Sequence, residues 1–282
     1  MPLVSVLLAV HNDDRFISEA IESVLRQTIS DLELIVVDDA STDETPARLA
    51  AADDPRLFVL RNDEQLGLAA SLNRGLERAQ GRYVARLDAD DVAFPQRLER
   101  QLGHMEGVAI LGTAVVDLDA DGRHGATHRN PLGRRAVRWH SLFSSPFFHP
   151  TVLVDRAALG ELRYETAFAE SEDYDLWTRV LANSDGANLA EPLVAKRVHS
   201  QQASRRRAAV QESFQRQVAL REIARIAPGV DAEPAWRVGA RKRGGSRRQF
   251  LRLLAAFQAR HGRDPEVLNL AARALLSPRR RS

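Results

Sequence analysis

Two kinds of apolar pattern alternate along the first 90 residues of this 282-residue chain. Short continuous apolar runs, rich in β-branched residues, predict buried strands at 3–10, 32–37, 57–60 and 83–87. Apolar residues at helical spacing predict helices over 16–29 and 66–79, and Ser41 with Glu44 fits a capping box that opens a further helix. The order β-α-β-α-β-α-β is typical of a parallel sheet with helices on both faces.

The pattern is less regular after residue 91. We expect a helix over 94–105, a strand over 108–116, a strand at 152–154, a helix over 173–181 and extended chain over 187–198. From 204 onward the pattern is helical, over about 205–226, 246–261 and 264–276. A chain of this length is large for one domain and small for two, so we predict an α/β domain over residues 1–204 and a basic helical extension over 205–282.

The composition, 44% hydrophobic and 28% charged, is that of a globular protein with an ample core. The longest apolar runs fall short of the roughly 18 residues of a membrane-spanning helix, and the N-terminus does not resemble a signal peptide. The absence of cysteine excludes disulfides, thiolate metal sites and cysteine nucleophiles. We therefore expect a cytoplasmic protein.

The net charge of +2 hides an asymmetry along the chain. Residues 205–282 hold 19 of the 40 Lys and Arg residues and carry a net charge of +13, whereas residues 1–204 carry −11. Three interpretations of the basic tail stay open: a solvated face or subunit contact, peripheral attachment to anionic lipid at the inner face of the membrane, and nucleic-acid binding. Because aromatic residues are sparse among the arginines and no binding motif is present, we expect no nucleic-acid partner.

Three carboxylates, those of Asp88, Asp90 and Asp91, follow the fourth predicted strand within four residues. The carboxyl ends of strands are where open α/β sheets bind ligands. Three such groups would repel one another unless a cation or hydrogen-bond donors neutralised them, and hard oxygen ligands suit Mg²⁺ or Mn²⁺. The alternative is that these residues cap a helix starting near Val92 and bind nothing.

The first predicted strand ends near Ala9 and His11, and the second ends at Asp39, so both ends share an edge with the three carboxylates. A carboxylate there accepts hydrogen bonds well from a base N–H or a ribose hydroxyl. The edge lacks the G-x-G-x-x-G and G-x-x-x-x-G-K-[ST] motifs, which counts against a dinucleotide oxidoreductase and a P-loop enzyme. The edge indicates a nucleoside pocket beside a metal that holds phosphates; alternatively, Asp39 only supports the turn at Ser41.

Several motifs, in their order and spacing, resemble those of family 2 glycosyltransferases, which have the GT-A fold. The motifs are 4–12 (VSVLLAVHN), 36–43 (VVDDASTD), 65–69 (QLGLA), 72–76 (LNRGL), 87–91 (LDADD), 172–177 (EDYDLW) and 197–204 (RVHSQQAS). The resemblance covers about residues 2–204. It implies a Rossmann-like, mostly parallel sheet flanked by helices. It also implies metal-dependent transfer of a sugar, with inversion, from a nucleotide-sugar, most often UDP-linked, to a glycan or lipid-linked acceptor.

The resemblance also implies roles for single residues. Asp39 would read the base and Asp88 would face the ribose, with Ala9, His11 and Gly67 also lining the nucleotide-sugar site. Family members usually have Pro and Tyr at the positions of Ala9 and His11. The base preference therefore stays open, and the His11 ring could either stack on the base or pack against the protein.

On the reaction side, the resemblance implies that Asp90 is a metal ligand, that His199 reaches the metal or the diphosphate, and that Asp173 is the catalytic base. Asp173 opens a predicted helix whose dipole would stabilise its anion, so we expect a lowered pKa and a modest base. Alternatively, Asp173 only caps that helix. We place His149 and Trp177 on the acceptor side because aromatic faces suit sugar rings, although such residues belong equally often to a core.

Two other function classes stay open. A nucleotidyltransferase of related fold would need a glycine-rich basic loop after the first strand, where this chain has His11-Asn12-Asp13-Asp14. A non-catalytic nucleotide-sugar-binding or scaffolding protein would be expected to have lost Asp90 or Asp173, and both are present.

Overall fold

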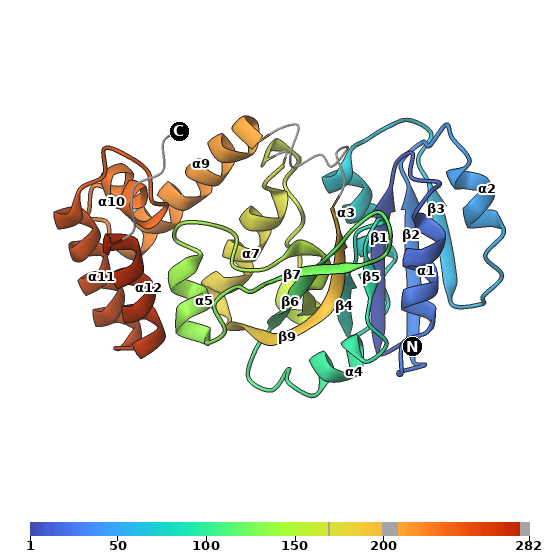
Figure 1. Cartoon of the computed structure of the whole chain (residues 1–282), viewed down its shortest axis with the longest axis horizontal. Coiled ribbons are helices and arrows are strands. Elements are labelled where there is room, and N and C mark those ends of the chain that lie inside the picture. The colour runs from blue at the N-terminus through green and yellow to red at the C-terminus, as the bar shows by residue number, and fades with distance from the viewer. Residues whose placement is uncertain (169, 199–207, 277–282) are drawn as a thin grey trace.

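In the computed structural model, which describes residues 1–168, 170–198 and 208–276, nine strands form one sheet (Figure 1). The strands are β1 (Val4–Val10), β2 (Leu32–Asp38), β3 (Leu57–Arg61), β4 (Tyr83–Arg86), β5 (Val92–Ala93), β6 (Ile110–Leu118), β7 (His124–His128), β8 (Leu153–Asp155) and β9 (Gly186–Arg197). Their order is β3-β2-β1-β4-β8-β6-β9-β5, with β7 paired to β6. Strands β3, β2, β1 and β4 are parallel, as predicted, whereas β8 runs antiparallel between β4 and β6.

Helices cover both faces of this sheet (Figure 1). They are α1 (Ile17–Leu25), α2 (Thr45–Ala50), α3 (Leu68–Arg78), α4 (Arg97–Leu102), α5 (Arg134–His140), α6 (Arg156–Leu159), α7 (Glu172–Asn183), α9 (Ala208–Ile226), α10 (Ala232–Gly239), α11 (Arg247–His261) and α12 (Pro265–Leu276). Side chains alternate across a strand, so Val6 and Leu8 of β1 belong to the hydrophobic cluster of α1, whereas Leu7 belongs to that of α3 and α7. The predicted α/β fold class with a helical C-terminal region is confirmed.

Several predicted boundaries differ from the structure. Residues 92–93 form a strand that pairs with β9, and the following helix begins only at Arg97, because Pro95 disfavours helical geometry in the residue before it. The capping box is also wrong: the helix begins at Thr45, and Ser41 Oγ instead accepts a hydrogen bond from the Asn12 N–H at 3.0 Å. The sequence pattern predicted neither α5 nor α10.

Helices α9 to α12 pack with α5 at one end of the molecule (Figure 1). The Trp139 ring meets Phe250 and Phe257 edge-on, with centroids 5.7 and 5.1 Å apart, so this cluster joins the C-terminal helices to residues 134–143. The predicted boundary at residue 204, and the basic runs 205–207 and 279–281, lie outside the described residues. Among the described helices, none combines the length and the apolar character needed to cross a membrane.

Candidate active site

The parallel register of β1, β2 and β4 brings three distant segments to one edge of the sheet. The residues there border two adjoining cavities: the carboxylate cavity, of about 840 Å³, which Asp88, Asp90 and Asp173 line, and the Asp39 cavity, of about 400 Å³. Both cavities share Ala9, Val10, His11, Leu68, Glu170 and Glu172 in their walls. Each predicted site residue that the structure describes borders one of these cavities, with the exception of Trp177.

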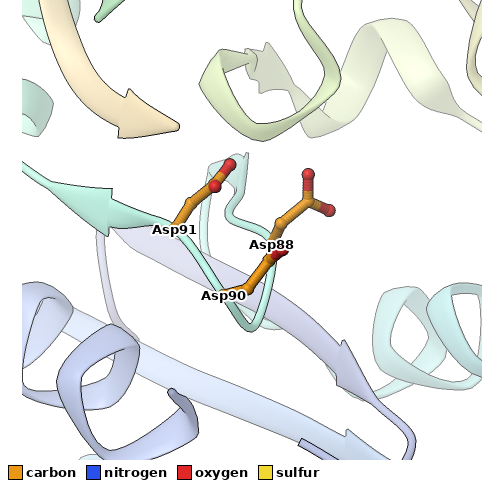
Figure 2. A group of neighbouring side chains, drawn as sticks. All are labelled: Asp88, Asp90 and Asp91. Atoms are coloured by element: carbon orange, nitrogen blue, oxygen red, sulfur yellow. The ribbon is translucent and has the colours of Figure 1, made fainter. Parts of the chain in front are cut away.

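Asp88, Asp90 and Asp91 lie on the turn that joins β4 to β5 (Figure 2). One oxygen of each carboxylate lies within 4.8 Å of the others. Asp91 is buried, and its Oδ1 accepts a hydrogen bond from the Arg197 backbone N–H at 2.9 Å. Because residues 92–93 are a strand and not a helix, the capping alternative for these carboxylates is excluded.

The chemistry of this turn fits a divalent cation. The Oδ2 atom of Asp91 is buried and has no hydrogen-bond partner among the described residues. Burial, and then the charges of Asp88 and Asp90, raise the pKa of Asp91 well above its ordinary value. A cation would relieve both conditions, and an all-oxygen donor set suits Mg²⁺ or Mn²⁺. His199, the other predicted ligand, lies outside the described residues.

Besides His11 and Arg15, the basic side chains of Arg86, His149 and Lys196 line the carboxylate cavity. The buried Arg86 guanidinium donates a hydrogen bond to the Asp88 carboxylate. Burial acts to raise the pKa of Asp88, but the Arg86 charge holds it below its ordinary value. Burial, and then the Arg86 charge, lower the pKa of His149 to about 3, so this imidazole is neutral at neutral pH.

Arg197 ties the end of β9 to the carboxylate turn. Besides the bond from its backbone to Asp91, its Nε donates to the Asp90 carbonyl oxygen at 2.9 Å, and its guanidinium pairs with Glu19 at 2.5 Å. Because neighbouring residues of a strand point to opposite sides, the adjacent Lys196 turns into the cavity.

Asp39 is buried in the wall of the smaller cavity. Its Oδ1 accepts hydrogen bonds from Asn62 Nδ2 at 2.6 Å and from the Leu66 N–H at 2.8 Å, and its Oδ2 accepts one from the Gly67 N–H at 2.8 Å. Burial acts to raise the pKa of Asp39, but these hydrogen bonds hold it below its ordinary value. The carboxylate is therefore held as an anion.

His11 stands where the two cavities meet. Its side chain is exposed, and Nδ1 lies 2.7 Å from the Asp39 carbonyl oxygen, so the ring is not part of the core. The turn at Ser41 is supported by Asp38, whose carboxylate accepts a hydrogen bond from the Ser41 N–H at 2.9 Å, and not by the Asp39 side chain. The alternative that Asp39 only supports this turn is therefore wrong.

Asp173 enters the carboxylate cavity from the first turn of α7, behind the N-cap residue Ser171. Burial raises the pKa of Asp173 to about 6; the Tyr174 N–H and the Ser145 hydroxyl, 3.3 Å from Oδ2, only partly oppose it. The predicted lowering of this pKa is therefore wrong, because burial outweighs the donors at the helix start. A carboxylate with this pKa is a stronger base than an ordinary aspartate.

Trp177 is not in contact with either of the two cavities at this edge. Its ring is 1% exposed and packs edge-on against His149 and Tyr164, with centroids 6.1 and 6.0 Å apart. The placement of Trp177 on the acceptor side is therefore corrected: it belongs to the core behind His149, and His149 borders the carboxylate cavity.

The sequence patterns missed several residues of the site: Arg86, Lys196, Glu172 and, from α9, Gln211 and Gln215. Two signals were available. Lys196 is one of only two lysines in the chain, and Glu172 directly precedes the predicted base. Nothing local distinguishes the two glutamines, which reach the cavity only through the packing of the C-terminal helices.

Comparison with known proteins agrees with this geometry. Residues 5–159 match the family model described as glycosyl transferase family 2. The putative glycosyltransferase EpsE of Bacillus subtilis is 35% identical over 215 residues, which are 73% of this chain and 76% of that protein. WfgD of Escherichia coli, a UDP-Glc:alpha-D-GlcNAc-diphosphoundecaprenol beta-1,3-glucosyltransferase, is 29% identical over 191 residues, which are 65% of this chain and 71% of that protein.

Solved structures show the same fold. The structure of S. aureus TarS 1-349 in complex with UDP-GlcNAc matches with a TM-score of 0.62 at 17% sequence identity. The match covers 98% of this chain and 90% of the TarS chain. The mannosyltransferase PcManGT from Pyrobaculum calidifontis, in complex with GDP-Man and Mn²⁺, matches with a TM-score of 0.62 at 20% sequence identity. The match covers 98% of this chain and 80% of the PcManGT chain. The chain spans 55% of a longer TarS structure. The chain is a glycosyltransferase of the GT-A fold and belongs to glycosyl transferase family 2.

Proposed function

We propose that this glycosyltransferase depends on a divalent cation and moves a sugar, with inversion, from a nucleotide-sugar to a hydroxyl of a glycan or lipid-linked acceptor. One observation carries the proposal: Asp88 and Asp90 line the same cavity as Asp173, the candidate base. The names of similar proteins support the classes of donor and acceptor, since WfgD is named for UDP-Glc and a diphosphoundecaprenol acceptor. The complex of PcManGT with GDP-Man and Mn²⁺ supports the use of a cation.

On the donor side, Asp39 would accept a hydrogen bond from the base, with His11, Ala9 and Gly67 forming the surrounding wall. Asp90 and Asp91 would hold the cation, Mg²⁺ or Mn²⁺, and Asp88 would face the ribose. When bound, such a cation supplies Lewis-acid stabilisation of a diphosphate, worth several kcal/mol. We prefer a UDP-linked donor.

On the acceptor side, Asp173 would take the proton of the attacking hydroxyl. The hydroxyl oxygen forms a bond to the anomeric carbon on the face opposite the diphosphate, and the bond to the diphosphate oxygen breaks with its electron pair. A single displacement of this kind inverts the anomeric carbon and releases a nucleoside diphosphate. Lys196 lines the cavity and would add positive charge where the leaving group gathers negative charge, and His149 would contact the acceptor.

Two measurements test the proposal. UDP with Mn²⁺ should raise the melting temperature of the wild-type protein and of Asp173→Asn, but not that of Asp90→Ala, because only a ligand that binds the folded state stabilises it. A nucleotide-sugar screen should then show release of UDP by the wild type, abolished in Asp173→Asn although UDP still binds. Turnover by Asp173→Asn at the wild-type rate would remove Asp173 from the proposed role, and equal stabilisation of Asp90→Ala would remove the metal site.

A further inference from the structure

A third cavity, of about 450 Å³, lies between the segment 139–144 and the C-terminal helices. We call it the helical cavity. Its apolar wall comes from α5 and the turn that follows it, and from α10, α11 and α12; it includes Phe143, Trp236 and Leu270. Its polar wall includes Gln211, Arg241 and Lys242. Nothing in the proposed donor site or the proposed displacement uses this cavity.

The helical cavity adjoins the carboxylate cavity, because Gln211 and Gln215 of α9 line both. Gln211 is held at the start of α7: its Nε2 donates to the Glu170 carbonyl oxygen at 3.0 Å, and its backbone carbonyl oxygen accepts a hydrogen bond from Ser171 Oγ at 3.3 Å. On the opposite wall, Ser144 lines the helical cavity while Ser145 lines the carboxylate cavity and donates to Asp173. A molecule in the helical cavity would therefore lie next to the cavity that Asp173 lines.

The charge of the helical cavity is positive. Lys242 is paired with Glu212 at 2.8 Å, whereas Arg241 has no carboxylate partner among the described residues. Burial, and then the nearby Arg241 charge, lower the pKa of His140 to about 4, so this ring adds no charge at neutral pH. The cavity thus offers one unbalanced guanidinium beside an apolar wall, which suits an anionic group attached to an apolar chain.

The backbone at Arg241 gives a second, independent reason to assign its side chain a function. Arg241 follows the C-cap of α10 with φ of +58°, a position and conformation at which glycine is strongly favoured. The chain keeps an arginine there in spite of the steric cost. Two residues before Arg241, Gly239 lets α10 approach Phe143 so closely that a Cβ added to Gly239 would lie 2.1 Å from the Phe143 ring. This close contact sets the position of the cavity wall that Phe143 forms.

We propose that the helical cavity binds the phosphate ester and the adjoining apolar segment of a lipid-linked acceptor, with Arg241 contacting the phosphate. The sugar of that acceptor would then extend past Gln211 and Ser145 to Asp173. The assignment rests on the proposed function for the identity of the molecule, but the binding that it requires is independent of turnover.

The test uses the full chain in EDTA, with farnesyl diphosphate as the probe and calorimetry as the measurement. EDTA removes metal-dependent binding of diphosphate at the carboxylate turn. We expect farnesyl diphosphate to bind at least about tenfold more tightly than farnesol or inorganic diphosphate, because neither control provides both the charge and the apolar chain. Equal affinity for inorganic diphosphate would overturn the apolar half of the proposal, and equal affinity for farnesol would overturn the phosphate half.

Variants locate the site. Arg241→Gly removes the cation and also relieves the positive φ, so we expect about a tenfold weaker affinity for farnesyl diphosphate and a melting temperature that is unchanged or higher. Arg248→Gln, an exposed arginine on α11 that lines none of the three cavities, is the matched control and should bind as the wild type does. Wild-type affinity in Arg241→Gly, or a loss of affinity in Asp90→Asn comparable to that expected for Arg241→Gly, would place the probe elsewhere and overturn the proposal.

The two proposals fail separately. If farnesyl diphosphate binds through Arg241 but no nucleotide-sugar is turned over, the proposed reaction fails while this binding site stands. If sugar transfer is found but farnesyl diphosphate does not bind, the acceptor enters by another route and the helical cavity is not its subsite.

Discussion

Replacing Asp173 by Asn removes a carboxylate whose ionisation opposes folding. The structure gives the sign: burial raises the pKa of Asp173 from its ordinary 3.8 to about 6. Between these two values the folded protein holds more protons than the unfolded chain, so stability falls as the pH rises through this window. Above about pH 6 the ionised Asp173 carboxylate lowers the free energy of unfolding by nearly its full amount, and at about pH 4 this loss of stability is small.

The magnitude follows from the shift. About two pKa units at roughly 1.4 kcal/mol each give about 3 kcal/mol as the most that Asn can recover at pH 8. For a chain of this length such a gain corresponds to an increase of about 5 °C in melting temperature. Asn keeps an oxygen that can accept the hydrogen bond from Ser145, so the substitution leaves that donor satisfied.

The same substitution two residues later provides a matched control with the opposite sign. Asp175 is fully buried, but Arg179 and Arg221 both pair with it, the former at 2.7 Å. Asp175→Asn leaves Arg179 without its anionic partner and leaves Arg221 with Glu222 alone, at 3.1 Å, and we expect it to lower the free energy of unfolding by about 3 kcal/mol.

The assay is chemical denaturation of both variants and the wild type at pH 4.5 and pH 8, with transfer activity measured in parallel. Asp173→Asn should gain about 3 kcal/mol at pH 8 and only about 1 kcal/mol at pH 4.5, and it should be inactive in transfer. A loss of stability at pH 8, or a gain of equal size at both pH values, would refute the reasoning that burial holds this carboxylate at a raised pKa.

Three further predictions concern activity. The value of kcat/KM should rise with pH through an apparent pKa near 6, because Asp173 acts only when deprotonated. Ser145→Ala removes a hydrogen bond to this anion and should therefore move the midpoint of the pH profile to higher pH; an unmoved midpoint would contradict the assignment of Asp173 as the base. Lys196→Gln should lower kcat about tenfold or more while the protein stays folded, whereas Arg100→Gln, at a surface ion pair, should change nothing; equal kcat in both variants would remove Lys196 from the reaction. Titration with EDTA should abolish transfer by the wild type, Mn²⁺ should restore it, and Asp91→Asn should raise the Mn²⁺ concentration required; activity that survives EDTA would contradict a metal at this turn.

Much of the fold was predictable because its first half is built from continuous apolar runs. The strands around Val6 and Ile35 are buried on both faces, so their sequences carry a strong signal, and the parallel register correctly placed Asp39 and Asp88 at the same edge of the sheet. The antiparallel insertion of β8 was not predictable, since a three-residue strand carries no signal for direction. Helix α10 contains Pro234 and ends close to two glycines, so its local pattern resembles a loop until Trp236 packs against α5 and α11.

The site was predictable where a residue type alone states the chemistry, as for the three aspartates after β4. It was not predictable where burial decides. The helix dipole at Asp173 is readable from sequence, but the burial that raises its pKa, and the charge of Asp88 that adds to the increase, come from the packing of distant segments. Likewise an aromatic residue such as Trp177 has the same sequence signal whether it faces a sugar or lies behind His149.

The hydrogen bonds of Asp39 have a consequence for donor selectivity. With two donors on Oδ1 and one on Oδ2, the carboxylate is oriented before any nucleotide arrives, so binding entails little loss of rotamer freedom there. Its remaining accepting capacity is concentrated on a single oxygen. Discrimination between uracil and guanine would therefore arise from the room between His11 and Leu68, which differs for one ring and two, more than from the count of contacts that Asp39 can add.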